Sequence, residues 1–227
     1  MLHQTTTECH LFPKVTQSNS QPCPSSWRVV LGPTPNTSED PSGQTKRTMS
    51  TVHLDKRTKL NLGSGRKPLP DYVNVDIVSS VNPDVVHNLE VVPYPFPDNR
   101  FELIAAYDVI EHVNNITGFM SEIWRLGKPG ATVEFTTPHF SCRNSFTDPT
   151  HVRHMSTASM DYFTKGNPLN FYGSEGFVVE TAQIIFGKGM LNRIGRLAYR
   201  LSPETYECRL AWIIPAWFIY FRLRVAK

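Results

Sequence analysis

The stretch Lys59-Leu-Asn-Leu-Gly-Ser-Gly-Arg66 constrains the fold more than any other part of this chain. It reads as a short buried strand, Lys59 to Leu62, followed by a glycine turn at Gly63-Ser-Gly65. A second apolar run, Tyr72 to Ile77, carries a carboxylate at Asp76. This layout is typical of a nucleotide site at the end of a parallel sheet. The glycines let backbone N–H groups approach a ligand closely, and the acid can accept ribose hydroxyls.

The apolar runs that follow predict an α/β fold. Strands are expected at Lys59–Leu62, Val73–Ile77, Asp84–Leu89, Phe101–Tyr107, Ala131–Thr137, Gly176–Phe186 and Ala216–Val225. Thr117–Gly127 has helical spacing, with Thr117 as the expected N-cap and Gly127 as the C-cap. The connection Gly63–Asp71 is too short for an ordinary crossover helix. We expect a Rossmann-like three-layer sandwich, whose sheet is mostly parallel with an antiparallel edge strand.

Residues 1–50 differ in composition from the rest of the chain. Of these 50 residues, 29 are Ser, Thr, Pro, Gln, Asn or Gly. Such a segment buries too little apolar surface to offset its ordering entropy, so we expect a disordered N-terminal extension followed by one folded domain over residues 51–227. Two explanations stay open: a natural flexible tail, or a reading frame assigned too long with its true start at Met49. We favour the second.

Charge and cysteine usage exclude several classes of protein. The formal net charge is only +3, which does not predict nucleic-acid binding. The four cysteines are scattered without a C-x-x-C pair, so neither a disulfide framework nor a zinc knuckle is expected. No apolar run approaches the roughly 18 residues of a membrane span, and the N-terminus lacks a secretory pattern. We therefore expect a cytoplasmic protein.

Further segments accompany the glycine turn in a fixed order. They are Asn74-Val-Asp76, Val86-His-Asn-Leu89, Tyr94–Asp98 with Phe101–Ile104, Val109-Ile-Glu-His-Val113, Arg125–Gly130, Pro138-His-Phe140 and Asp148-Pro-Thr-His151. From Lys59 onward the chain resembles the class I S-adenosylmethionine-dependent methyltransferases of the type 11 kind, which are frequent in bacterial glycan and cell-surface biosynthesis. The resemblance implies that residues 51–227 form a methyltransferase domain with S-adenosyl-L-methionine as its cofactor.

The resemblance also implies a set of cofactor-binding residues: Asn61, Gly63, Ser64, Gly65, Asp76, Ile77, Asn88, Leu89, Tyr107 and Asp108. The glycine turn would meet the methionine carboxylate through backbone amides, and Asp76 would accept the ribose hydroxyls. Ile77 would pack on the adenine ring, with Asn88 and Leu89 on its other side. The pair Tyr107-Asp108, at the end of the fourth strand, would face the sulfonium. Plainer roles stay open: Ile77 and Leu89 as ordinary core residues, and Asp76 as a helix cap.

Three positions depart from the family pattern. Asn61 stands where an acid is usual, so the methionine part keeps a hydrogen-bonding partner but loses a charge. Lys67 stands in place of a third glycine, in keeping with the short first connection. Asn88 replaces a frequent Asp, and an amide can both donate and accept at the adenine edge.

Candidate catalytic groups gather in the stretch Pro138–His154. It follows the fifth strand, and ligands of such sheets bind beyond the carboxyl ends of the strands. We predict catalytic roles for His139, Asp148 and His151, because a histidine oriented by a carboxylate is a workable general base. His112, beside Glu111, is as readily explained as a cap of the following helix. A divalent metal and a lid held by internal hydrogen bonds are the alternatives; no metal is expected, since the spacing matches no strong metal motif.

The C-terminal part from Gly187 is basic and aromatic. It holds eight basic residues against two acidic ones, with Trp212, Trp217, Phe218, Tyr220 and Phe221 interleaved. Peripheral membrane contact is one interpretation. The plainer one, which we favour, makes the aromatics strand core and the arginines their solvated rim.

Two functions remain open. The first is methyl transfer from S-adenosylmethionine to a small-molecule or glycan acceptor, at oxygen. The second is a non-catalytic module that binds S-adenosylmethionine or acts as a scaffold. A nicotinamide-dependent oxidoreductase is disfavoured, because Pro68 stands where the dinucleotide fingerprint needs its third glycine. No nucleic-acid partner is expected.

Overall fold

The structure, a computed structural model, describes residues 56–168 and 176–227, all within one compact unit, Gln44–Lys227. The extension expected at residues 1–50 lies outside the described residues. The described strands are β1 (Lys59–Leu62), β2 (Tyr72–Asp76), β3 (Val85–Val86), β4 (Phe101–Tyr107), β5 (Gly127–Pro138), β6 (Gly176–Ile185) and β7 (Phe218–Ala226). The helices are α1 (Ile116–Leu126), α2 (Asn144–Thr147), α3 (Met190–Leu201) and α4 (Pro203–Thr205). Short helical turns are η1 (Ser79–Val81), η2 (Ile110–His112), η3 (Ser159–Phe163) and η4 (Tyr206–Leu210).

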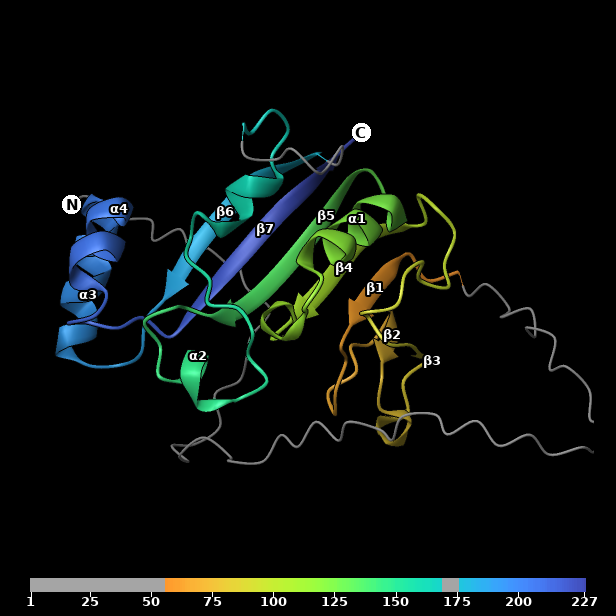
Figure 1. Ribbon diagram of the computed structural model, residues 1–227, viewed down its shortest axis with the longest axis horizontal. Coiled ribbons are helices and arrows are strands. Elements are labelled where there is room, and N and C mark those ends of the chain that lie inside the picture. Colours follow the sequence, from red (N-terminus) through yellow and green to blue (C-terminus); the bar gives the residue numbers. More distant parts are fainter. Residues whose placement is uncertain (1–55, 169–175) are drawn as a thin grey trace, which may run out of the picture. The chain divides into compact units, whose positions relative to one another are not determined.

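The strands form one sheet in the order β3-β2-β1-β4-β5-β7-β6 (Figure 1). The pairs from β3 to β5 are parallel, whereas β7 runs antiparallel to both β5 and β6. The expected α/β class, with a mostly parallel sheet and an antiparallel edge, is therefore confirmed. The third strand is shorter than expected, because only Val85–Val86 pair with β2. The segment between β1 and β2 contains turns but no helix, as its length predicts.

The main core lies between the sheet and α1. On β5, Val133 and Phe135 are fully buried, and so are Ile123 and Leu126 on the facing side of α1. Each large apolar side chain removed from water contributes roughly 1.5–3 kcal/mol. The cap of this helix lies two residues earlier than expected. Its N-cap is Asn115, whose Oδ1 accepts from Gly118 N at 3.0 Å, so the prediction of Thr117 as the cap is wrong.

The C-terminal end of α1 is confirmed at Gly127, which is also the first residue of β5. The fifth strand, expected at Ala131–Thr137, begins earlier, because β5 also includes Gly127–Gly130. The pairing of β4 with β5 shifts register between Phe101 and Leu103, which accommodates the extra residues at this end. A register irregularity of this kind is not visible in the hydrophobic pattern, since it depends on the partner strand.

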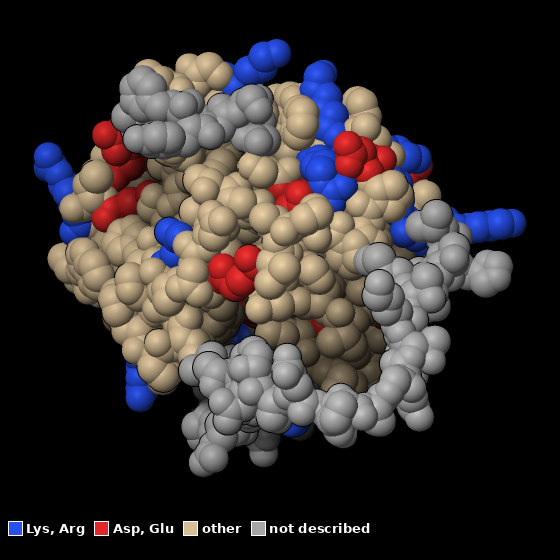
Figure 2. Space-filling view, turned by 45° about the vertical axis from the view of Figure 1, so that its right-hand side comes forward, with Lys and Arg blue, Asp and Glu red and all other residues tan. Residues whose placement is uncertain are grey.

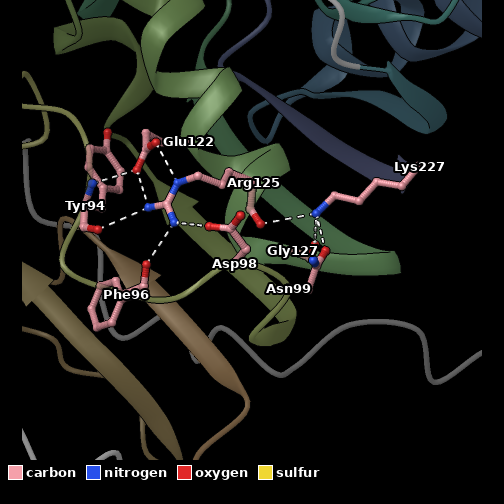
Figure 3. Close-up of polar contacts among 8 residues, drawn as sticks. All are labelled: Tyr94, Phe96, Asp98, Asn99, Glu122, Arg125, Gly127 and Lys227. Atoms are coloured by element: carbon pink, nitrogen blue, oxygen red, sulfur yellow. Dashed lines mark hydrogen bonds and ion pairs between the residues drawn. The ribbon is translucent and has the colours of Figure 1, made fainter.

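Arg125, at the end of α1, connects the helix to the loop before β4 (Figure 3). Its guanidinium donates to both carboxylate oxygens of Glu122, at 2.8 and 2.7 Å, and to Asp98 Oδ1 at 2.6 Å. It also donates to the carbonyl oxygens of Phe96 and Tyr94, at 2.9 and 3.1 Å. One side chain thereby holds a loop of three prolines against the helix.

The face of the molecule seen in Figure 2 has no large patch of charge of one sign. Basic and acidic side chains occur next to one another there, in keeping with the net charge of +3. Within the part of the chain that the structure describes, no helix is long and apolar enough to cross a membrane.

Candidate active site

The strand order reverses between β1 and β4, and this reversal defines a crevice. The chain proceeds outward from β1 to β3 on one side and from β4 to β5 on the other. In open parallel sheets, ligands bind outside the carboxyl ends of the strands at such a switch point. The residues at these ends are Leu62–Gly63, Asp76 and Tyr107–Asp108. The predicted cofactor residues therefore lie on the elements that border the crevice.

The glycine turn adopts backbone conformations that other residues rarely take. Gly63 has φ +67° and Gly65 has φ +52°, both in the left-handed region. A Cβ on Gly63 would lie 2.4 Å from Val109 Cγ2, so the glycine lets β1 and the segment after β4 pack closely. A Cβ on Gly65 would meet no atom within 4 Å. The space beside the Gly65 Cα is thus open, so a ligand can approach the turn closely there.

Asp76 holds this turn in place. Its Oδ2 accepts from Gly65 N at 2.7 Å, and its Oδ1 accepts from Val78 N at 2.9 Å. Each carboxylate oxygen has a further lone pair, so both can still accept a ribose hydroxyl. The helix-cap alternative does not apply, because Val78 precedes a turn that has no side-chain cap. The carboxylate instead links the ends of β1 and β2.

The residues expected around adenine differ in their surroundings. Ile77 is 56% exposed, so the ordinary-core interpretation of this residue is wrong, and its side chain is available to pack on a ligand. Leu89 is partly buried and packs against the main core, which favours the structural interpretation for that residue. Asn88 is exposed, and its Oδ1 accepts from Glu90 N at 3.0 Å, leaving the amide nitrogen for other partners.

Asn61 already has an internal partner. Its buried side chain donates from Nδ2 to Asn74 Oδ1 at 2.9 Å. Asn74 Oδ1 in turn accepts from Leu69 N at 2.8 Å, on the loop that follows the glycine turn. An acid at position 61 could not donate to Asn74. The two departures from the family pattern, Asn61 and the short first connection, therefore belong to one hydrogen-bonded arrangement.

Tyr107 and Asp108 are turned toward different partners. The Tyr107 hydroxyl donates to Glu134 Oε2 at 2.9 Å, and the Tyr220 hydroxyl donates to the other oxygen of the same carboxylate. Burial, followed by the charge of Glu134, raises the pKa of Tyr107, so its hydroxyl stays protonated. Asp108 has φ +57° and accepts from Thr136 Oγ1 at 2.9 Å. Burial raises the pKa of Asp108 as well.

A hydrogen-bond chain connects Asp148 to His112 rather than to His151. Asp148 Oδ1 accepts from Thr150 Oγ1 at 2.6 Å, and Thr150 Oγ1 lies 2.9 Å from His112 Nδ1. Burial opposes ionisation of Asp148, but the hydrogen bonds from Thr150 lower its pKa. The Thr150 hydroxyl donates its hydrogen bond to the ionised Asp148, so it can only accept a hydrogen bond from His112. His112 Nδ1 must therefore be the nitrogen that carries the proton. His112 Nε2 is then left as a free base or ligand atom.

His151 lies against His112 at the same place. The two ring centroids are 4.6 Å apart and the rings meet edge to face. His151 Nδ1 is buried without a hydrogen-bond partner, and so is Glu111 Oε2. Burial raises the pKa of Glu111 to about 8, and the charges of Asp108 and Asp148 act in the same direction. Burial, together with the nearby His151, lowers the pKa of His112.

The hydrogen-bonded and contacting residues just described form one cluster: Glu111, His112, Asp148, Thr150 and His151. His139 does not lie in this cluster. Its side chain is 0% exposed, with Nδ1 2.8 Å from Ser141 Oγ and Nε2 3.1 Å from Glu207 Oε1. A base must reach the proton that it removes, and a wholly buried imidazole with both nitrogens engaged cannot. The placement contradicts a catalytic role for His139 through direct contact with an acceptor. It joins the end of β5 to η4 instead.

Three members of the cluster were missing from the predicted catalytic set: Glu111, His112 and Thr150. The signal for Glu111 and His112 was their position directly after the central strand β4, where site residues of such sheets gather. Thr150 carried no signal beyond its place between Asp148 and His151. Its role depends on how the loop folds over η2, where Val152 N donates to Glu111 O at 2.9 Å.

The comparisons with known proteins agree with this geometry. Residues 53–135 match the sequence model of a family described as a methyltransferase domain of the type 11 group. The chain thus carries a methyltransferase domain. Its activity is S-adenosylmethionine-dependent methyl transfer, and S-adenosyl-L-methionine is its cofactor. No curated protein matches the chain by sequence.

Solved structures of methyltransferases resemble the chain in fold. An S-adenosylmethionine-dependent methyltransferase from Mesorhizobium loti is 12% identical, with a TM-score of 0.47, over 73% of this chain and 89% of the other. One from Archaeoglobus fulgidus is 16% identical, with a TM-score of 0.49, over 74% of this chain and 86% of the other. These are likenesses of fold.

Proposed function

We propose that this methyltransferase acts on a hydroxyl oxygen of a small-molecule or glycan acceptor. The observation that carries the proposal is the chain Asp148–Thr150–His112, which leaves His112 Nε2 unprotonated beside His151. His112 belongs to the segment directly after β4, in which Val109 lies against Gly63, and His151 lies against His112. A hydroxyl group must lose its proton as it is methylated. Imidazoles that can take up a proton at this place therefore suit a substrate that is methylated on a hydroxyl oxygen.

The cofactor-binding roles are part of the same proposal. The open space beside Gly65 supports close approach of the methionine part to the turn Gly63–Gly65. Because Ser64 N and Gly65 N already donate to Val75 O and Asp76 Oδ2, the methionine carboxylate would have to share these donors or displace their partners. Asp76, at the end of β2, would accept the ribose hydroxyls, and the exposed Ile77 would pack on adenine. Asn88 and Leu89 would border the adenine ring on the other side. Asn61 would act through Asn74 and the loop after the glycine turn rather than by direct contact.

The chemistry places two demands on the protein. S-adenosylmethionine supplies a methyl group whose bond to a positively charged sulfur breaks readily, with the electron pair going to sulfur. The acceptor oxygen must then lie in line with that bond, and its proton must leave. Tyr107 and Asp108 end β4 on the sulfonium side of the crevice in this proposal. The His112–His151 pair promotes loss of the proton.

The non-catalytic alternative has a specific observation in its favour. Asn61, which replaces the usual acid, is buried and donates to Asn74 within the protein. A module that binds S-adenosylmethionine without turnover would keep the glycine turn and Asp76 but would not need the His112–His151 pair. Turnover therefore separates the two functions.

We predict that His112→Ala and His151→Ala each slow turnover by about 10²-fold or more, the usual contribution of general-base groups. Purified protein is incubated with S-adenosylmethionine and a panel of hydroxylated acceptors, and release of S-adenosylhomocysteine is followed. Calorimetry should show unchanged affinity for S-adenosylmethionine in both variants. His154→Ala is the matched control, since His154 lies on the same loop but stacks on Phe146 and hydrogen-bonds Ser145. Full turnover in both test variants would contradict the proposed site.

We also propose that the C-terminal part contacts an anionic membrane surface. On α3, Met190, Ile194, Leu197 and Leu201 are exposed at the spacing i, i+4, i+7, i+11, which places them in one stripe. Such a stripe on a monomer marks an interaction surface. The opposite side of the helix packs inward: a Cβ on Gly195 would lie 2.7 Å from the Phe186 ring.

Basic and aromatic side chains accompany the stripe. Arg193, Arg196 and Arg200 share the helix with it. Trp212 and Trp217, on the segment before β7, are also exposed, so the interpretation of all these aromatics as strand core is wrong for the two tryptophans. Figure 1 places α3 and α4 beyond one end of β6 and β7. An apolar stripe with arginines and tryptophans is typical of helices that lie in the interface of an anionic bilayer.

We predict that Ile194→Asp with Leu197→Asp abolishes binding to vesicles that contain phosphatidylserine. Wild-type protein should co-sediment with these vesicles and not with neutral phosphatidylcholine vesicles. Arg193→Gln with Arg200→Gln should weaken binding roughly 30-fold, since each basic residue near an anionic surface contributes about 1 kcal/mol. Val178→Asp, an exposed apolar position on β6, is the control. If the stripe variant instead converts a dimer to a monomer in light scattering, the stripe binds a second copy and the membrane proposal fails.

The cytoplasmic location expected from the sequence stays a prediction, as does the assignment of residues 1–50.

A further inference from the structure

We propose that Glu111, His112 and His151 bind a divalent transition-metal ion. The ligand atoms that these residues offer all lie within 4.8 Å of one another. Two imidazole nitrogens and a carboxylate oxygen form a donor set that suits Zn²⁺, Mn²⁺, Fe²⁺ or Co²⁺ rather than Mg²⁺ or Ca²⁺. No metal is expected from the sequence, because the spacing of the histidines and acid in Pro138–His154 matches no strong metal motif. Two of the three ligands, Glu111 and His112, lie outside that stretch, 40 and 39 residues before His151.

Two buried polar atoms of these side chains have no hydrogen-bond partner. Glu111 is 1% exposed, yet its Oε2 has no hydrogen-bond partner. His151 Nδ1 is also buried and without a partner. Buried polar groups left unpaired cost about 1–3 kcal/mol each, so nearly all of them in folded proteins have a partner. A cation between these side chains would satisfy both atoms at once.

The backbone brings the three ligands together from two segments of the chain. Glu111 and His112 belong to η2, directly after the central strand β4. His151 comes from the loop after α2, and this loop is fastened to η2 by the hydrogen bond from Val152 N to Glu111 O at 2.9 Å. The site is thus assembled without any metal.

One of the proposed ligands, His112, is held by a hydrogen-bonded chain on the side of its ring away from the ion. His112 Nδ1 donates to Thr150 Oγ1, which donates to Asp148 Oδ1. Histidines that bind metals almost always hold their second ring nitrogen in this way, because it fixes the ring and its tautomer. Here the chain directs Nε2 of His112 away from Thr150 as a ligand atom. A histidine that merely capped a helix would not need an ionised carboxylate behind its hydrogen-bond partner.

Three protein ligands leave at least one coordination position open. A hydroxyl that occupies it loses its proton more easily, since a bound cation lowers the pKa of coordinated water or alcohol. This use of the ion rests on the proposed function and replaces direct proton acceptance by the two imidazoles, which are then ligands: the ion would hold the acceptor oxygen and favour release of its proton to solvent or a neighbouring base. Binding of the ion itself does not depend on the identity of the acceptor.

The test measures metal binding directly. The full chain is stripped with a chelator, dialysed, and titrated with Co²⁺ and Zn²⁺ by calorimetry, while the visible absorption of bound Co²⁺ reports coordination. We expect one site whose affinity falls at least 100-fold in His151→Ala and in Glu111→Gln. Thr150→Val should weaken binding by 10- to 100-fold, the usual effect of removing an outer partner. His154→Ala, on the same loop, should bind as tightly as the wild type.

Several outcomes would overturn the inference. One is the absence of a Co²⁺ absorption band. Another is binding that survives both Glu111→Gln and His151→Ala, which would assign the ion to other histidines or cysteines. Glu111→Gln preserves shape, so a folded but non-binding variant is informative even if His151→Ala unfolds. Turnover that persists in chelated, metal-free protein would overturn the catalytic use of the ion while sparing the proposed function. Metal binding without turnover of any acceptor would do the reverse.

Discussion

Replacing Arg125 with alanine is expected to lower the free energy of unfolding by about 3–5 kcal/mol, the range for breaking a buried ion pair by removing one partner. The large effect follows from what the guanidinium holds. Glu122 is buried, and both its oxygens accept from Arg125. Without Arg125 this carboxylate would remain at the interface between α1 and the loop before β4, with Tyr94 N as its remaining hydrogen-bond donor.

The same substitution removes the hydrogen bonds that Arg125 donates to two backbone carbonyl oxygens. Arg125 donates to Tyr94 O and Phe96 O, which belong to a proline-rich loop that has few backbone donors of its own (Figure 3). Tyr94 and Phe96 are themselves buried in the main core. Loss of Arg125 should therefore loosen the packing of this loop as well as the ion pair. The planar, five-donor guanidinium is the only side chain that can serve all these acceptors.

Urea unfolding followed by circular dichroism would measure the loss. Arg125→Lys should recover only part of the stability, since an ammonium cannot form the paired contacts with Glu122. Lys128→Ala is the control: its partner Glu102 is exposed, and exposed ion pairs contribute little. An Arg125→Ala variant as stable as Lys128→Ala would show that the network does not hold the loop.

The contribution of Arg125 should also depend on pH. Burial alone would raise the pKa of Glu122, but the hydrogen bonds from Arg125 and Tyr94 lower it below its usual 4.5. A carboxyl whose pKa is depressed in the folded state stabilises the fold above its unfolded pKa. That stability is lost as the pH falls through the folded value. The difference in stability between wild type and Arg125→Ala should accordingly shrink below about pH 4.5.

Much of the sheet could be predicted because its information is local. The apolar patterns of β4, β5 and β7 each involve only a few neighbouring residues, and so does the glycine turn after β1. Asp76 was placed correctly at the end of β2 for the same reason: its distance from the glycine turn reflects the geometry of two adjacent parallel strands.

The candidate site was predicted less well because it depends on long-range contacts. His139 and His112 look alike in sequence, each following a strand. Whether such a histidine meets solvent or is buried against η4 is decided by Glu207, 68 residues further along the chain. The link from Asp148 to His112 likewise spans 36 residues and runs through Thr150. A pattern of residue types cannot specify which loop folds over which strand end.

The glycine turn itself offers the sharpest contrast between two similar residues. Gly63→Ala is expected to destabilise the protein by about 2–5 kcal/mol, from the left-handed backbone and from the contact with Val109. Gly65→Ala should cost only about 1–2 kcal/mol, the backbone part alone, because no atom lies within 4 Å of its Cβ. Both values come from urea unfolding in the absence of S-adenosylmethionine.

A double variant separates the two causes at Gly63. The clash involves Val109 Cγ2, 2.4 Å from the new Cβ, and Val109→Ala removes that methyl group. Gly63→Ala should therefore be less damaging in the Val109→Ala background, with a favourable coupling energy of about 1–3 kcal/mol. Additive effects would mean that Val109 moves aside freely and that backbone strain alone makes glycine necessary. A favourable coupling would show that glycine is needed at position 63 because β1 packs closely against the segment after β4, the segment that leads to His112.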